Sequence, residues 1–395
     1  MSEYNKTRTI VRWKEVNVIH EGHRIYKSPT YFEKTALPTP LEEVPRKPTN
    51  FGIYEDDTVA EGETNWYRIG VYADGEELVS DALSVSESTS KDISFVVARN
   101  YSNTVRAYDA NGNQILSKSF SGYRENNNIN SVAVDINGNF YAVASDKRRA
   151  YKYDEIGNSL GTVGSRAAYA MDAYADGSIY LGEGGSVGKY SSDNTQQWKV
   201  GIHGSNIYGI AVDAAGYCYT GSNDNSVKKV SPNGILIWTF ESAANENVLG
   251  HSGAVNEVSV DYYGNVYTAS GDSTVKKLDS GGNQVWTFTG HTNNVTGVAV
   301  GPDDNIHTGS TDNTIKKIDP NGNVIWSTDI NTSANTLCVD PDGYTYVGTA
   351  NGVQKFDSAG TEITNAMFPM NEYGSTIHRL GVFPGKCIVS QKIPF

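Results

Sequence analysis

Short runs of alternating apolar and polar residues recur between Asn206 and Trp326, and turns rich in Gly, Asn and Asp separate them. In the first unit, GIAVD, YCYTGS, SVKKV and ILIWTF are such runs, separated by AAG, ND and SPNG. Residues with β-branched or aromatic side chains favour strands, and short turns between such runs predict hairpins. Each unit is therefore predicted to be an antiparallel meander of four short strands.

The unit occurs three times in a fixed register. The copies are Asn206–Trp238, Ala254–Trp286 and Asn294–Trp326. In each copy an Asp follows a His by 21 positions, so the copies are structural repeats rather than chance similarities. Periods of about 40 residues are typical of propellers and solenoids. A lone meander leaves apolar residues on both faces, whereas packing each sheet on the next buries them, as in a propeller blade.

Weaker copies extend the array in both directions. They are Ile129–Val163, Ala168–Val200 and Ala334–Ile363. Ile93–Phe120 matches strands two to four only, and Thr376–Phe383 resembles a lone first strand. We therefore predict a seven-bladed β-propeller, closed by the C-terminal strand. The alternative is an eight-bladed ring in which Lys386–Gln391 supplies a second closing strand.

The repeats resemble two known propeller families. Gly290–Asp319 is similar to WD-type repeats, from their Gly-His pair to their Trp-Asp pair, although Ile318 stands where the family has Trp. The following DPNGNVIW resembles quinoprotein-like propellers, which place a Trp on the last strand. The corresponding residues of this chain are Trp198, Trp238, Trp286 and Trp326.

The WD resemblance implies hydrogen-bonded sets of a His, a strand Ser and a turn Asp that hold each blade together. The expected sets are His203–Ser222–Asp224, His251–Ser270–Asp272 and His291–Ser310–Asp312. The first set departs from the family because Ile202 replaces the Gly before its His. The resemblance implies that these side chains are scaffold rather than catalytic groups.

Residues 1–85 have a different pattern, without the repeat turns and with five of the 12 prolines. Arg24–Tyr26, Tyr54–Val59 and Trp66–Ala73 resemble a fibronectin type III module, although the proline-rich Ala36–Pro48 departs from it. The resemblance implies a small β-sandwich. A polar linker at 86–91 would then precede a propeller spanning 92–395.

Two segments of this region also resemble sandwich modules of bacteriophage tail and other virion proteins. Their sequences are HEGHRIYKSPTYF and NWYRIGVYADGEELVSDALSV. This resemblance implies that residues 1–85 anchor the chain to other virion proteins. The chain would then be made in the host cytoplasm and would be one copy of several in an assembled particle.

The composition of the chain limits the kinds of partner that we expect. The chain is 38% hydrophobic and 19% charged with 40 Gly, as in turn-rich all-β proteins. A net charge of −13 disfavours nucleic acid as a partner. The three cysteines have no framework spacing, and no apolar run is long enough to span a membrane. We therefore expect buried thiols and no membrane insertion.

No catalytic, cofactor or metal motif emerges. There is no G-x-S-x-G motif, and His20 and His23 have no third zinc ligand nearby. Asp135, Asp319 and Asp340 begin turns that lack the further ligands of a calcium loop. We therefore expect no enzyme activity, cofactor or bound metal.

One insertion is a candidate interaction loop. It runs from Glu241 to Gly250 and includes Asn245, Glu246 and Asn247. Loops on a rigid scaffold often carry binding specificity, so this one could contact a host protein or glycan.

Together these features predict a non-enzymatic structural component of a phage tail, baseplate or head decoration. The N-terminal module would dock it, and the propeller would be displayed for protein or host-surface binding. One alternative is a cytoplasmic propeller scaffold that binds proteins or peptides. A further alternative is a quinoprotein-like or lyase-like enzyme.

Overall fold

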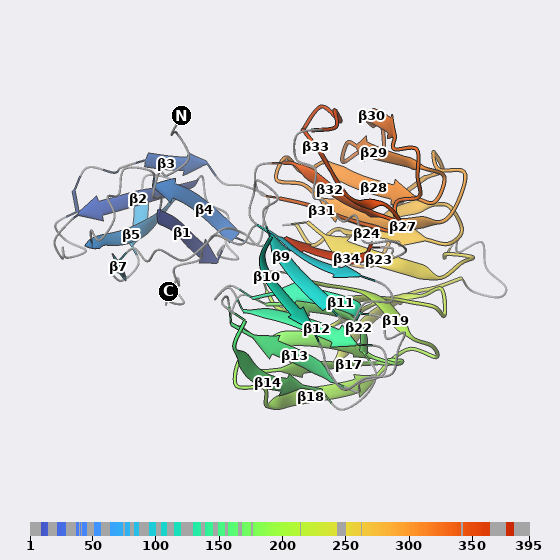
Figure 1. Ribbon diagram of the computed structural model, residues 1–395, viewed down its shortest axis with the longest axis horizontal. Helices are drawn as coiled ribbons and strands as arrows, with labels where there is room; N and C mark the ends of the chain where they lie inside the picture. Colours follow the sequence, from blue (N-terminus) through green and yellow to red (C-terminus); the bar gives the residue numbers. More distant parts are fainter. Residues whose placement is uncertain are drawn as a thin grey trace. The chain divides into compact units, whose positions relative to one another are not determined.

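A computed structural model of the chain is shown in Figure 1. It describes residues 129–363 except 136–138, 145–148, 155–156, 165–167, 175–176, 214, 243–249, 262 and 341–342, together with residues 37, 38 and 40, the strands between residues 9 and 119, and Ile377–Val382. The chain divides into two compact units. One is Met1–Asp92 with Gly385–Phe395, and the other is Ile93–Pro384.

The first unit contains two antiparallel sheets among its described strands. β1 (Thr9–Lys14) pairs with β4 (Phe51–Asp56). The second sheet contains β2 (Gly22–Ser28), β3 (Glu42–Pro45), β5 (Thr64–Ala73), β6 (Glu76–Val79) and β7 (Leu83–Ser86). Its order is β3–β2–β5–β6, and β5 is long enough to pair with β7 as well as β6 along one edge.

The predicted fibronectin type III sandwich is not evident in this unit. Immunoglobulin-like sandwiches divide about seven strands four and three between two sheets. Here the strands divide two and five, and β3 lies in the proline-rich stretch that was expected to lack strands. The all-β character of the unit is correct, but its specific sandwich topology is not supported.

The second unit is a β-propeller built from antiparallel meanders. The first sheet contains β8 (Phe95–Arg99), β9 (Thr104–Tyr108), β10 (Gln114–Ser119) and β34 (Ile377–Val382). The second contains β11 (Ile129–Val134), β12 (Phe140–Ala144), β13 (Ala150–Tyr153) and β14 (Ser159–Val163). The third contains β15 (Ala168–Ala173), β16 (Ile179–Glu183), β17 (Ser186–Tyr190) and β18 (Gln196–Gly201). The fourth contains β19 (Ile207–Val212), β20 (Cys218–Ser222), β21 (Val227–Val230) and β22 (Leu236–Phe240).

The remaining sheets repeat this plan. The fifth contains β23 (Val255–Val260), β24 (Val266–Ser270), β25 (Val275–Leu278) and β26 (Gln284–Phe288). The sixth contains β27 (Val295–Val300), β28 (Ile306–Ser310), β29 (Thr314–Ile318) and β30 (Val324–Asp329). The last contains β31 (Thr336–Val339), β32 (Thr345–Thr349) and β33 (Gly352–Phe356).

The ring closes as the sequence predicted. The inner strands β11, β15, β19, β23, β27 and β31 contact one another in succession, and β34 contacts both β31 and β11. β34 pairs antiparallel with β8, with Leu380 opposite Val97. Figure 1 shows β34, in red, among the teal strands of the first sheet. Closure by the C-terminal strand is therefore confirmed.

The prediction of seven blades is wrong, because the described strands form six blades. Six sheets have four strands, whereas β31–β33 form a three-stranded sheet. At its outer edge the described residues make only a single bridge, between Phe356 and Glu362. Thr364 stands at the sequence position that a Trp occupies in four other copies. Lys386–Gln391, the strand of the eight-bladed alternative, lies outside the described residues.

In four of the repeats a Trp on the last strand bonds to the repeat that follows. Trp286 on β26 donates its indole N–H to the Pro320 carbonyl at 3.0 Å, and Lys277 donates to the same carbonyl at 3.0 Å. The indole also covers Gly322, where an added Cβ would lie 3.4 Å from the ring. The same bond joins Trp198 to Pro232, Trp238 to Ser280 and Trp326 to Ser358. These contacts explain why a Trp recurs on the last strand.

Trp286→Phe is expected to destabilise the propeller by about 1–2 kcal/mol, because a phenyl ring is smaller than the indole and cannot donate a hydrogen bond to the Pro320 carbonyl. Lys277 still satisfies the Pro320 carbonyl, which limits the loss. Urea unfolding at constant pH measures the effect. Val285→Ala is the control, because Val285 is exposed on the same strand and should change stability by less than about 0.5 kcal/mol. If the two substitutions lowered the free energy of unfolding equally, the indole would not stabilise the contact between neighbouring repeats.

Candidate functional site

The predicted His and Asp residues meet in each of the three strongest repeats. His251 Nδ1 lies 2.9 Å from Asp272 Oδ2, and its Nε2 lies 2.7 Å from the Thr268 hydroxyl. Asp272 also accepts hydrogen bonds from the Ser252 backbone N–H and the Thr274 hydroxyl, at 2.9 and 2.6 Å. Equivalent contacts join His203 to Asp224 and Thr220, and His291 to Asp312 and Thr308. The imidazole is thus engaged at both nitrogens.

The predicted Ser does not take the position in the hydrogen-bonded set that the WD resemblance implied. Ser270 donates to the Gly253 carbonyl at 3.0 Å and accepts from the Asp272 backbone N–H at 3.2 Å, so it does not contact His251. The residue that sequence reasoning missed is a Thr two positions before the Ser in all three copies, as in TGS, TAS and TGS. Ser310 repeats these bonds, and Ser222 makes the corresponding ones to Ser205 and Asp224. The Thr268 hydroxyl that faces His251 is itself fully buried.

Burial keeps these imidazoles neutral. It lowers the pKa of His203 to about 4, against the attraction of the Asp224 carboxylate. For Asp224 itself, burial raises the pKa, but hydrogen bonds from Ser226 and the charge of His203 outweigh it and leave a pKa of about 2. The pKa values of His251 and His291 are likewise lowered by burial. At neutral pH each set is an ionised Asp held by a neutral His.

The His203 set predicts a specific pH dependence of stability. The folded-state pKa of about 4 lies below the ordinary value of 6.5, so the unfolded chain binds more protons between these values. The wild-type protein should therefore lose up to about 3 kcal/mol relative to His203→Gln as the pH falls from 7 to 4. Urea unfolding of both proteins at pH 7, 5.5 and 4 measures this difference. A difference that stays constant over that range would contradict a neutral, buried His203.

The candidate interaction loop begins and ends beside the second His set. Glu241 is exposed, and the Ser242 hydroxyl donates to the His251 carbonyl at 3.4 Å. Asn245, Glu246 and Asn247 lie outside the described residues, as do the side chains of His20 and His23. Within the described part of the chain no three His, Cys, Asp or Glu residues gather as a metal site. None of the described residues forms a helix that could cross a membrane.

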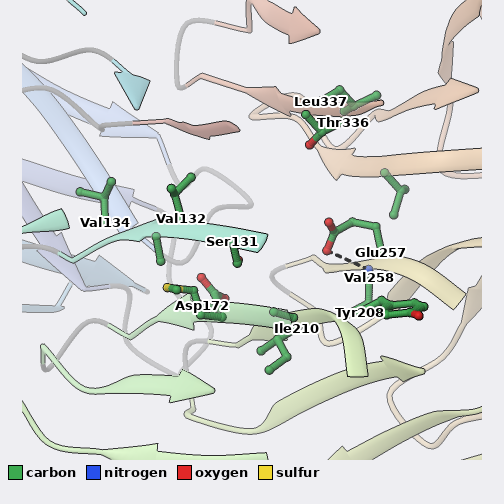
Figure 2. A pocket seen from close by; sticks show the side chains of 14 residues that line it. Ser131, Val132, Val134, Asp172, Tyr208, Ile210, Glu257, Val258, Thr336 and Leu337 are labelled. Atoms are coloured by element: carbon green, nitrogen blue, oxygen red, sulfur yellow. Dashed lines mark hydrogen bonds between the residues drawn. The ribbon is translucent and has the colours of Figure 1, made fainter. Parts of the chain in front are cut away.

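The propeller also encloses an axial cavity of about 220 Å³ (Figure 2). We use this name for the space lined by the inner strands β11, β15, β19, β23, β27 and β31. The register position directly after the β-bulge in most inner strands contributes Ser131, Ala170, Glu257 and Thr336 to its lining. The equivalent residues of β19 and β27 are Gly209 and Gly297, and that of β34 is Arg379. Glu257 is thus the one charged residue that this position adds to the described lining.

A second carboxylate shares the axial cavity. Asp172 Oδ2 accepts a hydrogen bond from the Val212 backbone N–H at 2.9 Å, and its Oδ1 accepts one from the Ala173 N–H at 2.9 Å. Burial raises the pKa of Asp172 to about 7 despite these bonds, and the negative charge of Glu257 adds to the increase. Figure 2 shows both carboxyl groups at the same cavity, reached from β15 and β23.

Aromatic surface accompanies the two acids. Tyr208 lines the axial cavity, and its ring packs edge-on against Tyr169 with centroids 6.2 Å apart. The described lining residues include no lysine, arginine or histidine. The site therefore combines negative charge with an aromatic face and apolar walls. Sequence analysis missed Asp172, Tyr208 and Glu257, and the one signal was that Glu257 and Arg379 stand in a repeat column whose other members are small.

Comparison with known proteins supports the fold. Residues 282–319 match the family model described as "WD domain, G-beta repeat". The chain is also similar to a solved structure titled "Crystal structure of WD40 beta propeller domain of Doa1". The TM-score is 0.56 and the identity 19%, and the match covers 66% of this chain and 88% of that one. No curated protein matches the sequence. The chain thus contains a WD-type repeat and folds as a β-propeller.

Proposed function

We propose that this chain is a non-enzymatic β-propeller that binds proteins. WD-type propellers generally mediate protein interactions. The observation that carries the proposal is the contrast between two kinds of polar site. Each His, Thr and Asp set lies within one blade, whereas the axial cavity gathers two carboxylates and a tyrosine from three blades. The former hold the scaffold together, and the latter offers recognition chemistry.

We further propose that the protein is a structural component of a phage particle. Support comes from the resemblance of residues 1–85 to virion modules, and from the separation of these residues from the propeller as a compact unit. In this role the first unit docks to other virion proteins in a tail, baseplate or head decoration. The propeller, including the loop after Glu241, remains available to a neighbouring subunit or to a host-surface protein or glycan.

Mass spectrometry of purified particles, combined with chemical cross-linking, tests both proposals. The expected result is the full chain in stoichiometric amount, with cross-links from residues 1–85 to another virion protein. Absence of the chain from the particles would contradict the virion role and favour the alternative of a cytoplasmic scaffold. A stoichiometric chromophore in the purified chain would contradict the non-enzymatic role.

A further inference from the structure

We infer that the outer edge of the fourth propeller sheet binds an extended segment of another protein in which aliphatic residues are interspersed with lysine or arginine. The surface is the outer patch, which we define as Ile235, Leu236 and Ile237. None of these residues lines the axial cavity, so the patch is a second contact. The inference rests on the proposed protein-binding function and names the chemistry of one partner.

Exposure of aliphatic side chains is the first part of the evidence. Ile235 is 63% exposed, Leu236 42% and Ile237 50%. No other three successive large aliphatic residues are exposed in the part of the chain that the structure describes. Single exposed apolar residues are common on protein surfaces, whereas adjacent ones with a polar surround mark interaction sites.

Other repeats show that the fold does not require apolar residues at these positions. Residues 195–197 of the third repeat are Thr, Gln and Gln, and residues 283–285 of the fifth are Asn, Gln and Val. All six are exposed. Strand pairing skips the residue before the Trp in each outer strand, so Ile237 is the extra residue of a β-bulge and has no partner on β21. An aliphatic run here therefore points to an external contact.

The edge of β22 also lacks the usual protection against pairing with another protein. β22 is the last strand of its sheet, and β21 is its partner among the described strands. Residues 235–240 contain no charged residue and no proline, the devices that commonly block a sheet edge. The bulge at Ile237 limits regular pairing to residues 238–240. An extended segment can pair there while its side chains cover the outer patch.

Carboxyl groups lie at the end and along the side of this strand. Glu241 follows β22 directly and is exposed. The Trp238 indole N–H donates to the Ser280 carbonyl at 3.1 Å, which places the turn that begins at Asp279 beside β22. Hydrogen bonds from Asn283 hold the pKa of Asp279 below its usual range, so this carboxyl group is ionised at neutral pH.

The lysines of β21 are held within the propeller. Lys228 Nζ donates to the Ile202 carbonyl at 2.7 Å, and Lys229, which is buried, donates to the Ser280 carbonyl at 3.2 Å. The exposed charge beside the outer patch is therefore negative, and a partner segment with lysine or arginine complements it. A second copy of this chain would bring the same carboxyl groups and a net charge of −13, which disfavours self-association.

The test measures the binding of three capped heptapeptides to the full chain by calorimetry, at low and at high salt. Lysine alternates with valine in the first peptide. Glutamate replaces the lysine in the second, and serine replaces the valine in the third. One saturable site is expected for the lysine–valine peptide, with weaker binding at high salt, and none for the other two.

The matched variant gives the outer patch the residues of the third repeat, through Ile235→Thr, Leu236→Gln and Ile237→Gln together. Its melting temperature should stay within about 3 °C of that of the wild type, because all three positions are exposed. Its affinity for the lysine–valine peptide should fall at least about tenfold. Val285→Gln, at the exposed aliphatic position of β26, is the control and should leave the affinity unchanged. Glu241→Gln should weaken binding about threefold.

Several outcomes would overturn the inference. They are equal binding of either control peptide, no binding of the lysine–valine peptide, and an unchanged affinity in the triple variant. Sedimentation that shows a dimer, with the dimer lost in the triple variant, would also overturn it, because the outer patch would then bind a second copy.

Failure of the proposed function is distinguishable from failure of this inference. If the lysine–valine peptide binds as expected but the propeller cross-links to no protein in particles, the protein-binding function is contradicted. If the propeller cross-links to a partner and the triple variant keeps all of its cross-links, only the outer patch is contradicted.

Discussion

Truncation before Thr376 should lower the stability of the propeller by about 4 kcal/mol or more and broaden its unfolding transition. The shortened chain lacks β34, which pairs with β8 over Ile377–Val382 and contacts β11 and β31. Without it, β8 becomes an open edge and the inner faces of two neighbouring sheets lose their cover. Calorimetry should show a melting temperature about 10 °C lower or more.

The matched control is truncation before Gly385, which keeps β34 and removes only residues assigned to the other unit. Its propeller transition should match that of the full chain. If both truncations unfold at the same temperature, the stability of the ring does not depend on its C-terminal strand. The pairing of β34 with β8 would then contribute nothing measurable to stability.

Gly209→Ala is expected to lower the free energy of unfolding by about 2–3 kcal/mol. An added Cβ would lie 2.7 Å from both the Glu257 Cα and the Val258 backbone nitrogen, on the neighbouring inner strand. These are backbone atoms, so no side-chain rotation relieves the clash, and β19 and β23 must separate. Denaturant unfolding at neutral pH measures the loss.

Gly201→Ala provides the comparison. Its Cβ would meet only the Ser186 hydroxyl, at 3.5 Å, which is ordinary contact. Glycine gives the unfolded chain extra freedom, so this alanine should be neutral or stabilising by up to about 1 kcal/mol. A loss at Gly201 as large as that at Gly209 would show that glycine-to-alanine effects here do not follow inter-blade distance.

The repeated meanders could be predicted from sequence because their signals are local. Strand residues, turn glycines and the His-to-Asp spacing recur together, and the structure places His251 and Asp272 in contact. The role of Thr268 was also present in the repeat but was assigned to Ser270, because strand neighbours two apart share a face and pattern alone does not distinguish them.

The axial cavity could not be predicted because it depends on long-range assembly. Asp172 and Glu257 come from different blades, and only closure of the ring brings them to one space. The blade count was wrong because the copy from Ala334 to Ile363 matches the unit in its turns, although its described residues form only the three strands β31–β33. The strands of the first unit could be predicted from sequence, but their division between two sheets could not, because it depends on which strands pair.

Site-specific photo-cross-linking tests most directly whether the axial cavity is where the protein binds its partners. A photoreactive phenylalanine analogue at position 208 of the full chain, which lines the axial cavity, should capture a partner protein in cells or particles. The same analogue in place of Val285, exposed on an outer strand, should capture none. Capture at position 285 with none at position 208 would contradict the account.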